Sequence, residues 1–151
     1  SVGMAKALEQ CFHQATQNDS TIHAVYVVDV RAFIMLPEET QNRVRELLLE
    51  EGENAVQFVK DQAEKRDIPI ETAILEGIPH EEIITYGEEE EMDLIVMGTH
   101  GQSGDQKRIL GSVAEEVVRS SKMPVLTVKM TEAEMEYVDA DVPEEQQRYI
   151  A

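Results

Sequence analysis

Residues 93–113 read DLIVMGTHGQSGDQKRILGSV, in which an apolar strand is followed by a glycine-rich loop and by the first residues of a helix. Four of the chain's 8 glycines lie between positions 98 and 111. Glycine lets a backbone turn sharply and approach a ligand closely, and the free N–H groups at a helix start attract anions. The segment therefore predicts a phosphate site with Ser112 as a hydroxyl donor. A plain connector in which Ser112 caps the helix explains the same glycines equally well.

The charge of the chain limits the ligands that it can attract. Its 31 acidic residues against 13 basic ones give a formal net charge of −18. Nucleic acids and anionic membranes are bound mainly through lysine and arginine, so the composition argues against both as partners. Lys107 and Arg108 outweigh Asp105 in the glycine-rich loop, which makes this loop a local cationic exception.

The sequence lacks several common catalytic and metal-binding patterns. The loop has neither the Gly-Lys-Ser/Thr ending of a Walker loop nor the G-x-G-x-x-G spacing of a dinucleotide-binding turn. No nucleophile elbow with a matching His and Asp is found. His13, His23 and His80 do not have the spacing of metal ligands. We therefore predict no catalytic residue and no metal ion held by the protein's own side chains.

Four apolar runs are expected to be strands buried on both faces, at residues 22–28, 70–75, 94–97 and 125–128. The segments between them have helical spacing. The first helix stops at Asn18-Asp19-Ser20, and Gly52 is expected to weaken or bend the second, at 38–66. The third begins at Pro79, and the fourth begins near Ser112. Inward-facing residues are expected to be Val2, Ala5, Leu8, Phe12 and Ala15 in the first helix, Val44, Leu48, Ala55, Val59 and Ala63 in the second, and Val113, Val117 and Val118 in the fourth.

This alternation predicts an α/β domain with a parallel sheet, right-handed crossovers and helices on both faces. Ligands bind such sheets beyond the carboxyl ends of the strands. The single cysteine, Cys11, excludes an internal disulfide and is expected to lie on the core side of its helix. No basic-then-apolar leader and no long apolar run are found, so we expect a cytoplasmic location.

The spacing Gly98-x2-Gly101-x9-Gly111-Ser112 resembles the ATP-binding signature of the universal stress protein family. The resemblance runs from Ser1 to about Lys129. It also includes YVVD at 26–29, GIPHEEI at 77–83 and PVLTVK at 124–129. It assigns residues 1–130 to one universal stress protein domain and leaves 131–151 as an acidic C-terminal tail, which is expected to be flexible or partner-dependent.

The resemblance implies an open five-stranded parallel sheet of order 3-2-1-4-5, a Rossmann-like fold similar to the adenine nucleotide alpha hydrolases, with ATP at the switch point. It implies that Val27 lines the adenine pocket and that Met97 and Gly98 shape the ribose and phosphate side. Gly101 then gives the phosphates access to the backbone.

The resemblance also implies that Gly111, Ser112 and Val113 offer N–H groups and one hydroxyl at the helix start. Mg²⁺ or Mn²⁺ is expected to bridge phosphate oxygens rather than to occupy a protein cage. Dimers are implied through the last strand, Val125–Val128, which is expected to lie at a sheet edge.

One feature of the family pattern is missing from the sequence. Family members begin with a strand and an Asp-x-Ser turn whose Asp contacts the nucleotide, and Ser1 stands where the serine of that turn is expected. We expect that the sequence is truncated there. Because that strand is central in the family's order, its loss exposes two inner edges of the sheet.

The sequence therefore predicts an ATP-binding, homodimeric regulator of a stress response. A nucleotide-free dimeric scaffold that uses the last strand and the acidic tail is the first alternative. A slow ATP hydrolase is the second, but no general base, arginine finger or Walker acid is found, so efficient catalysis is not expected.

Overall fold

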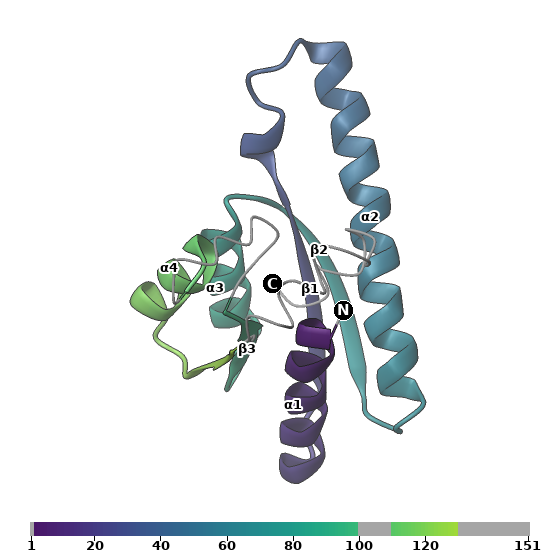
Figure 1. The fold of residues 1–151 in the computed structure, drawn as a ribbon, viewed down its shortest axis with the longest axis vertical. Coiled ribbons are helices and arrows are strands. Elements are labelled where there is room, and N and C mark those ends of the chain that lie inside the picture. The colour runs from purple at the N-terminus through teal and green to yellow at the C-terminus, as the bar shows by residue number, and fades with distance from the viewer. Residues whose placement is uncertain (1, 100–109, 130–151) are drawn as a thin grey trace.

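The computed structural model of the chain describes residues 2–99 and 110–129, within which helices and strands alternate as predicted (Figure 1). The acidic tail and most of the glycine-rich loop lie outside these residues. The helices are α1 (Val2–Asn18), the short 3-10 helix η1 (Val30–Ala32), α2 (Glu38–Glu64), α3 (Pro79–Glu89) and α4 (Ser112–Ser120). The strands are β1 (Ile22–Asp29), β2 (Ile70–Gly77), β3 (Ile95–Gly98) and β4 (Val125–Val128).

The four strands form two parallel pairs. β1 pairs with β2 so that Asp29 lies opposite Gly77, and β3 pairs with β4 so that Gly98 lies opposite Val128. The expected five-stranded order is not seen, because the strands make two separate two-stranded sheets. Among the described strands, β1 and β3 each have a backbone partner on one side only. The sequence predicts two such edges when the first strand of the family pattern is missing.

Helices cover both faces of the strands, which confirms that part of the prediction. On one face, α1 and α2 bury every second side chain of β1, namely Ile22, Ala24, Tyr26 and Val28. On the other face, α3 and α4 pack Ile83, Ala114 and Val117 against Ile95 and Met97 of β3. Each large aliphatic side chain buried in this way contributes about 1.5–3 kcal/mol to folding.

The predicted inward faces of the helices are largely confirmed. In α2, Ala55, Val59 and Ala63 are buried, and Val44 and Leu48 pack against the same core. The expectation for Val118 is wrong, because 46% of this residue is exposed. One residue rotates a helix by about 100°, so the buried Val117 turns its successor toward solvent.

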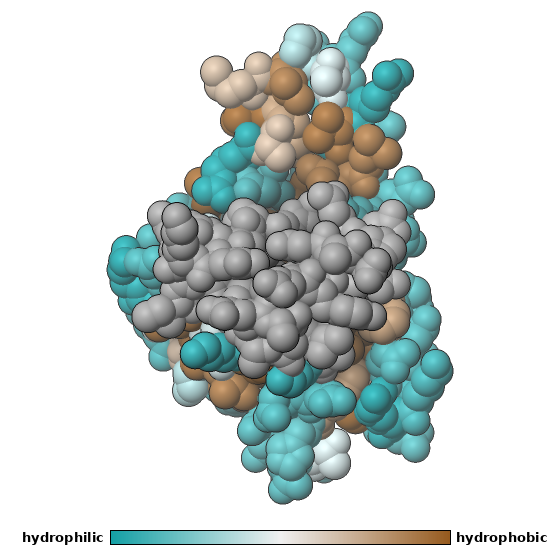
Figure 2. Space-filling view, viewed as in Figure 1, coloured by the Kyte–Doolittle hydropathy of each residue, from teal (hydrophilic) through white to brown (hydrophobic). Residues whose placement is uncertain are grey.

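Apolar side chains gather on the surface where η1 leads into α2, at one end of the molecule (Figure 2). Ile34 is 60% exposed and Met35 is 92% exposed. A surface cluster of this kind is typical of contact surfaces. None of the described helices has both the length and the apolar character needed to cross a membrane.

Gly52 lets α2 lie close to the ring of Tyr26. A Cβ atom built on Gly52 lies 2.6 Å from Cδ1 of Tyr26, a separation that real Cβ atoms do not tolerate. The Tyr26 ring is itself only 4% exposed, so it has little room to move. The structure therefore gives Gly52 a packing role, whereas the sequence predicts only a weakened or bent helix.

We expect Gly52→Ala to destabilise the protein by about 1–3 kcal/mol, because overpacking against Tyr26 outweighs the better helix propensity of alanine. Urea unfolding followed by circular dichroism measures this change. Glu53→Ala, at the exposed next position, serves as the control and should change stability by less than about 0.5 kcal/mol. A higher unfolding midpoint for Gly52→Ala contradicts the packing argument.

Candidate functional site

The predicted phosphate site begins where β3 ends, and Thr99 ties it to the neighbouring elements. The Thr99 N–H donates to the carbonyl of Val128 at 3.1 Å, and the Thr99 carbonyl accepts from the Gly111 N–H at 2.6 Å. Only 4% of Thr99 is exposed. These two bonds hold the carboxyl end of β4 and the start of α4 beside the end of β3.

The start of α4 presents backbone N–H groups that no helical carbonyl accepts. The Glu115 N–H donates to the Gly111 carbonyl at 2.9 Å and opens the helical series of bonds. The amides of Ser112, Val113 and Ala114 precede that bond, so they have no acceptor within the helix. They form a compact group of donors at the positive end of the helix dipole.

Two expectations about this helix start need correction. Gly111, which is extended at φ −69° and ψ 164°, is the N-cap, so Ser112 is the first helical residue and makes no capping bond. The expectation that the Gly111 N–H is offered to a ligand is also wrong, because Thr99 already accepts it. The exposed Ser112 hydroxyl remains available, and Ala114 supplies the amide that Gly111 does not.

The structure brings together three of the apolar residues expected to line the nucleotide. Val27, Met97 and Val113 belong to one hydrophobic cluster, which Leu110 also joins. Met97 is only 3% exposed, so its side chain supports the site from the core. Val27 and Val113 are half-buried and keep part of their surface accessible.

Of the two glycines expected near the phosphates, Gly98 and Gly101, the structure describes only Gly98. Gly98 is the last residue of β3 and is half-buried. Gly101 lies outside the described residues, as do Lys107 and Arg108.

Asp29, at the carboxyl end of β1, is hydrogen bonded to Arg31. Its carboxylate accepts from the Arg31 N–H at 3.0 Å and from the guanidinium of Arg31 at 2.9 and 2.8 Å. These bonds to Arg31 lower the pKa of Asp29, since they stabilise its charged form. Asp29 therefore caps the turn into η1, which confirms the turn-cap interpretation of its place at a strand end.

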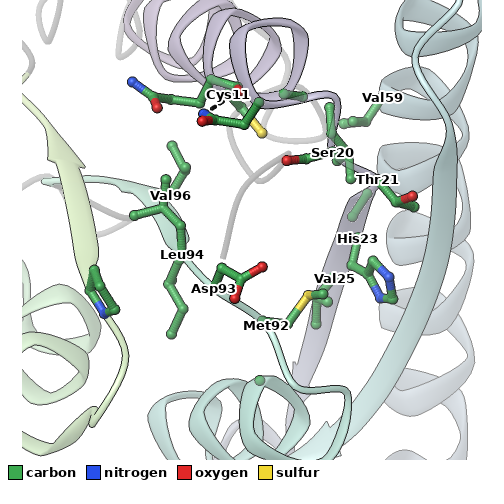
Figure 3. A pocket seen from close by; sticks show the side chains of 18 of the residues that line it. Cys11, Ser20, Thr21, His23, Val25, Val59, Met92, Asp93, Leu94 and Val96 are labelled. Carbon is green, nitrogen blue, oxygen red and sulfur yellow. Dashed lines mark hydrogen bonds between the residues drawn. The ribbon is translucent and has the colours of Figure 1, made fainter.

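A cavity of about 890 Å³ lies between β1 and β3, apart from the predicted phosphate site. In Figure 3, Val25 of β1 faces Leu94 and Val96 across it, and Cys11 of α1 reaches its upper wall. Ile83 and Gly87 of α3 line it as well. The cavity thus occupies the space between the unpaired edge of β1 and the unpaired edge of β3.

A group of polar residues that the sequence does not predict lies at the amino end of β1. His23 donates to or accepts from the Tyr86 hydroxyl through Nδ1 at 2.8 Å, and its Nε2 lies 3.5 Å from a Glu71 carboxylate oxygen. A Glu90 carboxylate oxygen completes a group of three atoms within 4.8 Å of one another. We call His23, Glu71, Tyr86 and Glu90 the His23 cluster. Nothing in the spacing of these residues along the chain reveals it.

The sequence model that describes the Universal stress protein family matches residues 1–129. The chain belongs to this family. It is 42% identical over 130 residues to Universal stress protein MJ0531 of Methanocaldococcus jannaschii, with 85% of this chain and 76% of that protein aligned. The membership confirms the resemblance seen in the sequence.

Solved structures of the family share the fold. That of protein MJ0577, also from M. jannaschii, matches with a TM-score of 0.78 at 32% identity, over 85% of this chain and 88% of that one. Two structures of lower identity contain adenine nucleotides. One is a universal stress protein in complex with cAMP (TM-score 0.57, 22% identity, 87% and 91% covered). The other, from Arabidopsis thaliana, has AMP bound (TM-score 0.61, 20% identity, 86% and 80% covered).

We expect Cys11 to react slowly with iodoacetamide, although it lines the cavity. Burial raises the pKa of its thiol to about 11, which keeps it protonated at pH 8, and only the thiolate is a good nucleophile. Alkylation at pH 8, followed by mass spectrometry, should be at least about tenfold slower in the folded chain than in denaturing urea. Equal rates in the two conditions contradict the burial of this thiol.

Proposed function

We propose that this universal stress protein binds ATP at the start of α4. The observation that carries the proposal is the set of N–H groups of Ser112, Val113 and Ala114, which have no helical acceptor and lie next to the exposed Ser112 hydroxyl. Three adjacent donors at a helix start suit a phosphate group. Gly98 and Gly101 let the backbone of the intervening loop approach the phosphates closely, and Lys107 and Arg108 supply positive charge within that loop.

The adenine and ribose are proposed to rest on the apolar residues beside this helix start. Val27 and Val113 are half-buried members of one hydrophobic cluster, and they pack against its buried residues, which include Met97. Partly exposed aliphatic side chains suit the flat, weakly polar face of a purine. The cAMP and AMP held by two structures of the same fold support an adenine nucleotide as the ligand class.

Mg²⁺ or Mn²⁺ is proposed to reach this site through the phosphate oxygens. The two carboxylates of α4 are already engaged, because Arg119 pairs with Glu115 at 2.7 Å and with Glu116 at 3.2 Å. Mg²⁺ commonly keeps several water ligands and binds through substrate phosphates. A divalent ion therefore adds charge compensation without a dedicated protein cage.

The complete sheet is proposed to have the order 3-2-1-4-5, with one more parallel strand between β1 and β3. Both of these strands have an edge without a backbone partner in the described chain, and the cavity of about 890 Å³ separates them. A strand placed there hydrogen bonds to both edges at once. It also fills a cavity whose walls include Val25, Leu94 and Val96.

The role proposed for the protein is that of a cytoplasmic, nucleotide-dependent regulator of a stress response rather than of an efficient enzyme. Asp29 is held by Arg31, and Glu115 and Glu116 by Arg119, so these carboxylates are poorly placed to activate a water molecule. A nucleotide that regulates the protein by changing its stability or assembly needs no carboxylate that acts as a general base.

We expect ATP with Mg²⁺ to raise the melting temperature of the protein. At about 100 times the dissociation constant, the ligand should add about 2.7 kcal/mol of stability. Ser112→Ala should weaken binding by about tenfold, because it removes one hydrogen bond to a charged group. Ser120→Ala, an exposed serine at the other end of α4, should bind as the unaltered protein does.

Differential scanning fluorimetry across millimolar ATP, with AMP and cAMP in parallel, measures these effects. The absence of any shift with ATP overturns the proposal and favours a nucleotide-free scaffold. Phosphate release that disappears in Ser112→Ala supports slow ATP hydrolysis instead.

We also propose a homodimer through the outer edge of β4. Among the described strands, Val125–Val128 pairs with β3 alone, and all four of its residues are half-buried. Pairing with a second copy satisfies that edge.

We expect sedimentation velocity to show a dimer at micromolar concentration and Leu126→Glu to shift it to a monomer, because a buried interfacial charge is costly. Val118→Glu, on the exposed side of α4, is the control and should remain dimeric. Circular dichroism confirms that each variant is folded. A monomeric unaltered protein contradicts the proposed dimer.

A further inference from the structure

We propose that the His23 cluster is a binding site for a divalent transition-metal ion of the Zn²⁺ class, with His23, Glu71 and Glu90 as its ligands. The three residues come from three elements: His23 from β1, Glu71 from β2, and Glu90 from the turn that ends α3. The parallel register of β1 and β2 places His23 directly opposite Glu71. The site is separate from the start of α4, so it does not depend on the proposed nucleotide function.

The imidazole of His23 is well oriented for a metal. Its side chain is only 10% exposed, and its Nδ1 lies 2.8 Å from the Tyr86 hydroxyl. When Nδ1 donates its proton to that oxygen, Nε2 carries the lone pair and lies 3.5 Å from a carboxylate oxygen of Glu71. Metal-bound histidines almost always have such a partner on the second nitrogen, which fixes the tautomer and the ring. Tyr86 is therefore a positioning residue of the site.

The second nitrogen of His23 has no hydrogen bond among the described residues. A carboxylate oxygen of Glu71 lies 3.5 Å from it, which is long for a hydrogen bond. That separation matches a shared ion, because two ligands about 2.0–2.1 Å from a tetrahedral metal lie roughly 3.3–3.5 Å apart. In Figure 3 the ring of His23 lies on the far side of β1 from Leu94 and Val96, away from the middle of the cavity.

No described lysine or arginine compensates the negative charges of the cluster. The ligand atoms of Glu71 and Glu90 lie within 4.8 Å of each other, and no lysine or arginine of the described chain pairs with either. A divalent cation relieves the repulsion between the two carboxylates.

The ligand types favour the Zn²⁺ class over Mg²⁺ and Ca²⁺. One imidazole nitrogen and two carboxylate oxygens form a mixed N/O set, whereas Mg²⁺ and Ca²⁺ prefer oxygen alone. Three protein ligands leave one tetrahedral position for water. Glu71 has 66% of its side chain exposed, and Glu90 is exposed as well, so both can turn toward an ion held by the buried histidine.

Calorimetric titration of the nucleotide-free, chelator-treated protein with Zn²⁺ tests the proposal, and Co²⁺ absorption reports the coordination. We expect one equivalent to bind. His23→Gln and Glu90→Gln should each abolish saturable binding. Glu89→Gln, an exposed glutamate one residue away, is the matched control and should leave it unchanged.

Tyr86→Phe should keep one equivalent but lower the affinity by about 10–100-fold, and should shift the pH at which Co²⁺ binds, because the imidazole loses its orienting partner. Far-UV circular dichroism verifies that each variant is folded. Binding that is equal in Glu89→Gln and Glu90→Gln, or no saturable binding by the unaltered protein, overturns the proposal. Because no nucleotide is present, neither result bears on the ATP proposal.

Discussion

The β1–β2 pair and the β3–β4 pair are held together by side chains buried beneath α1 and α3, not by backbone hydrogen bonds between the two sheets. No backbone hydrogen bond joins β1 to β3 within the described strands, and a cavity separates them. α1 packs Leu8, Phe12 and Ala15 into the core of β1 and α2, and it also contacts β3 and β4. On the opposite face, α3 contacts β1, β2 and α4. The position of Val27 relative to the start of α4, and with it the candidate nucleotide site, depends on these two helices.

The elements were largely predictable from sequence because their signals are local. Runs of β-branched residues identify all four strands, and Pro79 marks the first turn of α3. The buried stripe of α2 follows from spacing alone. The strand patterns alone do not predict the division into two sheets. That division is expected only from the resemblance to a family whose sheet has one more central strand. The close approach of Gly52 to Tyr26 was not predictable, because it depends on how two distant elements pack.

The candidate sites show the same division between local and long-range information. A glycine-serine pair before a helix predicts a group of free amides, and the start of α4 has them. Gly111 rather than Ser112 is the cap, and its N–H bonds to the Thr99 carbonyl, a contact that no local pattern encodes. The His23 cluster needs the register of β1 against β2 and the end of α3, so the spacing of histidines could not reveal it.

The direction of the unpaired edges of β1 and β3, which face each other, affects how this chain behaves among its own copies. Exposed strand edges are templates for association between molecules, and long flat ones lead to aggregates. Here the free edges of β1 and β3 lie between α1 and α3 and face each other across the cavity. Once the strand that we propose for this space pairs with β1 and β3, neither of these edges remains as a template for another molecule.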